Sequence, residues 1–153
     1  MKQLLLLLLL LCQIVVHAAP PTTPSSVLTS SNVDGDRITL SWTMGNGSRR
    51  IVVVTTNAAV TGRPVNGVDY TENAVFGQGN TLAPGEYIVG DFSGNTVNVY
   101  GLQPATTYRF AVFEYNGTGF STEYLSTPGT GAFTTAVTPL TQTSALNVTN
   151  IAP

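Results

Sequence analysis

The chain has 153 residues, a formal net charge of −2 at pH 7 and only 9% charged side chains. This length holds one domain core of about 100 residues with additional loops. Because six basic residues stand against eight acidic ones, no basic stripe exists that could attract a phosphate backbone, which excludes nucleic acid as a partner.

The first 18 residues have the pattern of a secretory signal peptide. Lys2 precedes an apolar run from Leu4 to Val16, which is shorter than the about 20 residues that a membrane span needs. Val16 and Ala18 are the small residues expected before a cleavage site at Ala19. We therefore expect a secreted or cell-surface protein whose mature chain has no membrane span.

A second interpretation of this segment is a lipoprotein signal that ends at Cys12. It is disfavoured because Leu11 is bulky where such a signal has a small residue, and because Cys12 lies within the apolar run. Cleavage after residue 18 removes every cysteine, histidine and lysine of the sequence. Since the common nucleophilic and acid–base sites use these residues, we predict no enzyme activity, no cofactor and no metal.

The strands begin after a Pro/Thr-rich lead over residues 19–25, which is expected to stay extended. The predicted strands are 27–33, 37–43, 49–56, 69–71, 86–92, 96–100, 107–115 and 132–135. In the second of these, Ile38, Leu40 and Trp42 alternate with polar residues, as in a strand with one buried face. The third is apolar on both faces, which predicts a central strand covered on both sides.

Residues 56–95 have a weaker pattern, because glycine, asparagine and proline interrupt the two short strands expected there. Turns at residues 77–80 and 83–85 predict a hairpin arm that lies along the edge of the sheets.

The stretch from Gly101 to Asn116 has the pattern of a tyrosine corner. A turn with Pro104 leads into a strand in which Tyr108 and two further apolar residues share one face, and the Tyr108 hydroxyl can reach back to the turn backbone. The residues expected in the core are Trp42, Leu102, Tyr108, Phe110 and Val112.

With Leu40-Ser41-Trp42 and the stretch Gly101 to Tyr108, the chain resembles a fibronectin type III domain over about Pro24 to Ala136. It is most similar to the domains of bacterial secreted and cell-surface multidomain proteins. The resemblance implies an all-β, immunoglobulin-like sandwich over residues 26–136 with an enlarged connection between strands C and E. No Arg-Gly-Asp triplet is present, so the resemblance does not imply integrin binding.

The tail shows a short internal repeat. Ser26 to Val33 aligns with Ser144 to Ile151, 118 residues later, and each copy follows a Pro/Thr-rich approach. We therefore expect residues 137–153 to contain a linker and the start of a second repeat, so that the partners of this domain include other domains of a longer tandem chain.

Several acidic residues are expected to be solvated: Asp34, Asp36, Asp69, Glu72, Glu86 and Asp91. Asp34-Gly35-Asp36 could start a calcium loop, but the further oxygen ligands of such a loop are missing and a hairpin turn is favoured. Of the adjacent Arg49 and Arg50, one is expected to point outward and to pair loosely with an acidic neighbour.

Candidate ligand contacts come from five aromatic residues in irregular segments, namely Tyr70, Phe76, Phe92, Phe120 and Tyr124. Exposed rings can stack on sugars or anchor a protein, whereas buried rings would only hold the loops on the sandwich. We predict a non-catalytic extracellular spacer, adhesion or protein-interaction module. The alternative is a carbohydrate-binding accessory module of a secreted glycan-active enzyme, which predicts two coplanar exposed rings among the five.

Overall fold

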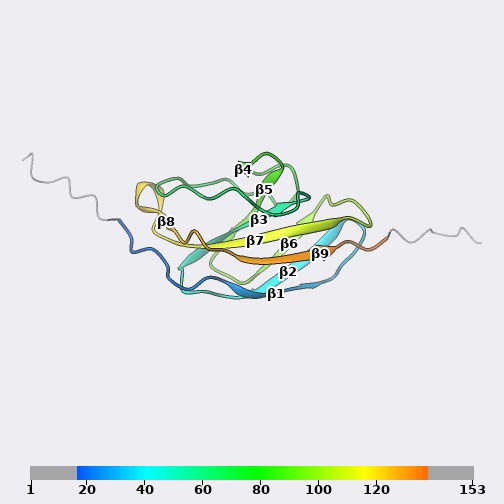
Figure 1. Cartoon of the computed structure of the whole chain (residues 1–153), viewed down its shortest axis with the longest axis horizontal. Helices are drawn as coiled ribbons and strands as arrows, with labels where there is room; N and C mark the ends of the chain where they lie inside the picture. Colours follow the sequence, from blue (N-terminus) through cyan, green and yellow to red (C-terminus); the bar gives the residue numbers. More distant parts are fainter. Residues whose placement is uncertain (1–16, 138–153) are drawn as a thin grey trace, which may run out of the picture.

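The computed structural model describes residues 17–137, which form two facing antiparallel sheets (Figure 1). The apolar run of the predicted signal peptide lies in residues 1–16, outside the described residues. The predicted second repeat lies in residues 138–153, also outside them. The described chain enters at one end of the long axis and leaves at the other (Figure 1). Within residues 17–137, no helix is long and apolar enough to cross a membrane.

The smaller sheet has the order β1-β2-β6. Its strands are β1 (Ser26–Ser31), β2 (Arg37–Thr43) and β6 (Thr96–Tyr100). In β2, buried residues alternate with less buried ones, as the sequence predicted, because successive side chains of a strand point to opposite faces. The register places Thr39 opposite Asn98 and Ser41 opposite Thr96 on the outer face.

Strand β1 contains a β-bulge, because its register against β2 shifts between Ser26 and Thr29. Val27 lies at the bulge with φ 49°, a left-handed conformation that is unfavourable for a β-branched residue. Its side chain is 71% exposed, whereas the next residue, Leu28, packs against the core. The bulge thus turns Leu28 inward at the cost of local strain.

The larger sheet has the order β4-β5-β3-β7, and both β8 and β9 pair with β7 at different parts of its length. Its strands are β4 (Thr81–Ala83), β5 (Glu86–Phe92), β3 (Arg49–Thr55), β7 (Thr107–Asn116), β8 (Glu123–Tyr124) and β9 (Gly129–Thr134). Strand β3 is central and buried along nearly its whole length, so the prediction from its continuous apolar run is confirmed.

The predicted pattern of strands needs correction. Residues 69–71 form no strand. Instead the Thr71 N–H donates to Asn80 Oδ1 at 2.7 Å, and the Asn80 N–H donates to the Thr71 carbonyl oxygen at 2.8 Å. The last strand begins three residues earlier than predicted, since β9 pairs with β7 from Gly129 onward. The glycine-rich loop before it also contains a short 3-10 helix, η1 (Gly119–Ser121), and β8, which the sequence pattern did not indicate.

The space between the sheets is filled by one apolar cluster. Its buried members are Ile38, Leu40, Trp42, Val52, Val54, Val89, Val97, Val99, Leu102, Tyr108, Phe110 and Val112. At one end of this cluster, the Gln103 N–H donates to the Tyr108 hydroxyl at 2.8 Å. The tyrosine corner is therefore present, and its ring lies in the same cluster as the Trp42 indole.

A second apolar cluster covers the outer face of the larger sheet. Its buried members are Ile51, Val53, Ile88, Ala111, Phe113, Tyr115 and Tyr124, with Val60, Tyr70 and Leu82 packed against them. The sequence predicted a hairpin arm along the edge, and the β4–β5 hairpin does lie there. The rest of the connection between β3 and β4 instead passes over the face of the sheet (Figure 1), because the outward residues of β3 and β7 are apolar and need cover.

Candidate functional site

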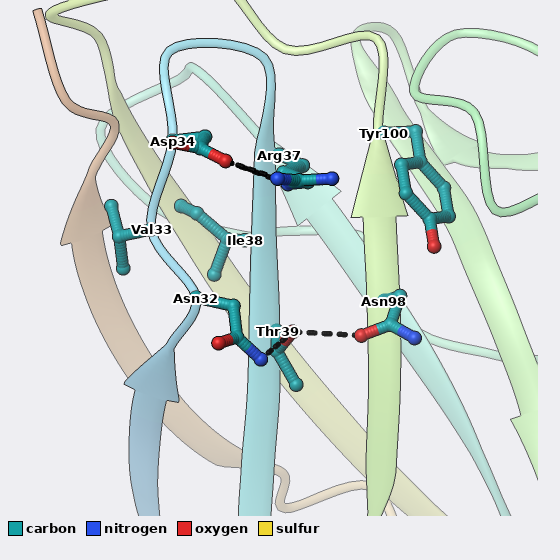
Figure 2. Close-up of a pocket in the computed structure, with 8 residues that line it drawn as sticks. All are labelled: Asn32, Val33, Asp34, Arg37, Ile38, Thr39, Asn98 and Tyr100. Carbon is teal, nitrogen blue, oxygen red and sulfur yellow. Dashed lines mark hydrogen bonds and ion pairs between the residues drawn. The ribbon is translucent and has the colours of Figure 1, made fainter.

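A polar groove lies on the outer face of the smaller sheet (Figure 2). Its volume is about 530 Å³. Its polar lining residues are Asn32, Asp34, Arg37, Thr39, Asn98 and Tyr100. They come from the turn between β1 and β2, from β2 and from β6, so this turn and the register of β2 against β6 build the groove.

Three side chains form a hydrogen-bonded row across the groove. Asn32 Nδ2 donates to Thr39 Oγ1 at 3.3 Å, and Thr39 Oγ1 donates to Asn98 Oδ1 at 2.7 Å. Asn32 has φ 46°, a left-handed conformation that asparagine tolerates, directly after β1 ends. Among the described residues, the Asn32 Oδ1 acceptor and the Asn98 Nδ2 donor have no partner, so both can bind a ligand.

An exposed ion pair lies at the end of the groove. Arg37 Nε donates to Asp34 Oδ2 at 2.8 Å, and the Arg37 Nη2 also contacts this oxygen. The hydrogen bond that Arg37 donates to the Asp34 carboxylate raises the pKa of Arg37. Because the two charges compensate one another, the groove carries no net charge, although it keeps both donors and acceptors.

The Tyr100 ring completes the groove. It lies at the end of β6 beside Asn98 (Figure 2) and is 42% exposed. A half-exposed phenol offers an apolar face together with a hydroxyl group. Sequence reasoning missed this groove. The alternation of β2 and β6 identifies the outward residues, but the sequence pattern does not show which strands are neighbours in the sheet.

The five aromatic residues proposed as ligand contacts do not form one surface. Phe120 is 87% exposed on η1, at the opposite end of the domain from the groove (Figure 1). Tyr124 is buried and meets Tyr70 edge-on, with ring centroids 6.1 Å apart and planes at 63°. Phe76 and Phe92 pack against the cluster between the sheets, and Phe76 meets the Tyr108 ring edge-on. The five therefore contain no pair of coplanar exposed rings.

The residues expected in the core, Trp42, Leu102, Tyr108, Phe110 and Val112, are all buried between the sheets.

The expectation of solvated acids is wrong for Glu86. This residue is only 1% exposed and accepts three hydrogen bonds, from the Thr61 N–H at 2.7 Å, the Thr61 hydroxyl at 2.8 Å and the Gly62 N–H at 2.8 Å. These donors replace water around the carboxylate. Glu86 therefore holds the long connection onto the larger sheet.

The carboxylates of Asp69 and Asp91 also join separate segments of the fold by hydrogen bonds. Asp69 accepts from the Thr122 hydroxyl at 2.7 Å and from the Gly119 N–H at 2.8 Å, which ties the long connection to the loop that carries η1. Asp91 accepts from Arg49 Nη2 at 2.8 Å and from the Tyr115 hydroxyl at 2.7 Å. Arg49 is thus the half-exposed, paired cation that the sequence predicted.

Arg50 forms a buried ion pair that sequence reasoning missed. Arg50 Nη2 donates to Glu114 Oε2 at 2.9 Å, and both side chains are almost fully buried. The Glu114 carboxylate also accepts from the Gly45 N–H at 2.9 Å, the Gly47 N–H at 3.1 Å and the Ser25 hydroxyl. The position of Glu114 could have been foreseen. It follows Phe110 and Val112 at intervals of two residues along the strand, so its side chain points to the same face, between the sheets.

Two tyrosines of the outer cluster have perturbed acidity. Burial, together with the hydrogen bond to Asp91, raises the pKa of Tyr115 to about 12. Burial likewise raises the pKa of Tyr124. The hydrogen bond to Tyr115 raises the pKa of Arg49. These groups keep their protons at neutral pH. The two tyrosines lie in the apolar cluster beneath the connection between β3 and β4.

Within the described part of the chain, no group of three or more histidine, cysteine, aspartate or glutamate side chains could hold a metal ion. In the Asp34-Gly35-Asp36 turn, the Asp34 carboxylate is instead occupied by Arg37.

No protein-family model matches the sequence, and a comparison with curated proteins finds no match. The solved structures with a similar fold include a redesigned protein and a natural domain. A computationally redesigned β-sandwich protein superimposes with a TM-score of 0.51 at 17% identity, over 76% of this chain and 92% of its own. The fibronectin type III domain of human fibronectin type III domain containing protein 3 superimposes with a TM-score of 0.50 at 15% identity, over 84% of this chain and 98% of its own.

Proposed function

We propose that this chain, which has the fibronectin type III fold, is a non-catalytic extracellular module. It spaces or presents other domains of a longer secreted or cell-surface protein and contacts extracellular partners through its uncovered faces. The observation that carries this proposal is the position of the described chain ends, which lie at opposite ends of the long axis (Figure 1). Domains with this arrangement can be joined end to end.

A non-catalytic role is supported by the use of the buried carboxylates. Glycoside hydrolysis, for example, needs two carboxylates facing a substrate across a cleft. Glu86 and Glu114 are instead saturated by backbone and side-chain donors that hold loops. Asp34, which lines the polar groove, is paired with Arg37.

The spacer role is tested by a distance measurement on the exported chain. The only cysteine of the sequence is Cys12, within the predicted signal peptide, so Ala19→Cys and Val137→Cys introduce a unique pair of labels. We expect a single narrow distance distribution that matches the long axis of the domain. A broad or short distribution, or a disordered far-UV circular dichroism spectrum, would reject the spacer.

Export is tested separately by the N-terminal sequence of the secreted protein. We expect it to begin at Ala19. Retention of the complete chain inside the cell would contradict an extracellular role.

A second candidate function, a carbohydrate-binding accessory module, is favoured by the polar groove. It no longer relies on the aromatic residues of the loops, since these do not form a coplanar exposed pair. It relies on the unpartnered Asn32 Oδ1 and Asn98 Nδ2 atoms beside the half-exposed Tyr100 ring.

A further inference from the structure

We propose that the smaller sheet binds an extended, uncharged glycan that runs from the polar groove across Asn98 and Tyr100 into a second depression. This inference rests on the second proposed function and specifies its ligand class and its site. The starting observation is that the two depressions share these two residues as lining. Asn98 and Tyr100 therefore form a ridge that a single ligand can contact from both sides.

The second depression lies along the edge of β6 that faces away from β2, where the backbone of Ala74 and Phe76 bonds to Tyr100. Its volume is about 470 Å³, and it is bounded by β5, by β6 and by the segment around Asn73. Phe92 contributes apolar surface above the buried Val89 and Val97, whereas Glu72 and Asn73 contribute polar groups. Each depression is within the range of about 300–1,000 Å³ that small-molecule sites have. An occupant of both must be elongated.

The balance of charge favours an uncharged ligand. In the groove, Asp34 and Arg37 neutralise one another, and the second depression adds the carboxylate of Glu72 without a basic residue. A phosphate, sulfate or uronate would meet this carboxylate without a compensating cation. A sugar hydroxyl, in contrast, donates and accepts at the same time.

The available hydrogen-bonding groups match such hydroxyls. Asn32 Oδ1 accepts and Asn98 Nδ2 donates, while their other amide atoms are held by Thr39, which fixes their orientation. The Tyr100 ring, 42% exposed between the two depressions, offers a face for the C–H groups of a sugar ring. The row of side chains is thus oriented before a ligand arrives, which lowers the entropic cost of binding.

The test is a titration of the exported, ¹⁵N-labelled chain with neutral hexasaccharides, namely cellohexaose, xylohexaose and mannohexaose, monitored by backbone amide shifts. Hexagalacturonate and a heparin hexasaccharide serve as charged probes. We expect at least one neutral probe to give saturable shifts around both depressions and to bind more tightly than the charged probes. Tyr100→Ala and Asn98→Ala should each weaken binding by about tenfold or more.

Phe120→Ala is the matched control, since it removes an exposed aromatic ring at the other end of the domain and should leave binding unchanged. Four results would overturn the inference: no saturable shifts with any neutral probe at millimolar concentration, tighter binding of a charged probe, shifts confined to one depression, or binding that depends on Phe120 and not on Tyr100. Capture of a protein ligand by this face, without glycan shifts, would likewise overturn it.

The spectrum without ligand separates this inference from the proposed module. A dispersed spectrum with no glycan shifts rejects the glycan site alone. A collapsed spectrum in the absence of any probe rejects the folded module itself.

Discussion

The two outer faces of this sandwich differ in what covers them. On the larger sheet, Phe113 points outward from β7 and is 0% exposed, because the connection between β3 and β4 lies over it. On the smaller sheet, Thr39 and Asn98 point outward into an open groove (Figure 2). The same strand geometry thus produces a hidden face that stabilises the domain and an open face that can bind.

This difference is visible in the strand patterns. Strand β2 alternates between apolar and polar residues, whereas β3 is apolar on both sides. Alternation is typical of a sheet with one solvent-exposed face, and a continuous apolar run is typical of a strand buried on both faces. The alternation of β2 therefore marks the sheet whose outer face stays open to solvent.

The largest expected effect concerns the buried ion pair. Glu114→Gln leaves the Arg50 guanidinium buried without its counter-charge and should lower the free energy of unfolding by about 3–5 kcal/mol, measured by urea unfolding. Asp34→Asn, which breaks the exposed pair with Arg37, is the control and should change stability far less. Equal effects of the two substitutions would contradict the contrast between buried and open surfaces.

The cover of the larger sheet is tested by Phe113→Ala. Because this ring is fully buried beneath the long connection, its removal should cost about 3–4 kcal/mol of unfolding free energy. Proteolysis within residues 56–80 should also become faster, since the connection loses its apolar contact. A variant as stable and as protease-resistant as the parent would show that the connection does not rest on this cluster.

A smaller effect is expected from alkaline pH. The folded state raises the pKa of Tyr115 to about 12, above the usual tyrosine value of about 10, so between these values the folded chain keeps a proton that the unfolded chain has lost. The free energy of unfolding should therefore fall as pH rises from about 10 to about 12. Urea unfolding at about pH 9 and about pH 11.5 measures this fall, which should be smaller in Tyr115→Phe. An identical fall in both proteins would show that Tyr115 does not contribute.

The smallest effect is expected on the open face. Thr39→Ala removes a hydroxyl that bridges two asparagine side chains, and should change the free energy of unfolding by less than about 1 kcal/mol. A loss comparable to that of Phe113→Ala, measured by the same urea unfolding, would mean that the row of polar side chains is structural rather than available for binding.

Much of the fold could be predicted from local patterns. The bounds of β2 and β6, the burial of β3 and the hydrogen bond of the Tyr108 hydroxyl all follow from period-two alternation and turn chemistry. The site could not be predicted in the same way. Residue type alone singles out the five loop aromatics, whereas the groove depends on which residues of the β1–β2 turn, β2 and β6 become neighbours.

The sequence by itself determined the paired sheets, the inward set around Trp42 and Tyr108, and the polar outward set of β2, because these depend on residues close together in the chain. Only the tertiary structure decided that the long connection covers the larger sheet, that Arg50 and Glu114 meet between the sheets, and that Asn32, Thr39 and Asn98 form one row. Each of these arrangements joins residues from different segments of the chain. Their proximity arises from closure of the sandwich as a whole, which no local pattern encodes.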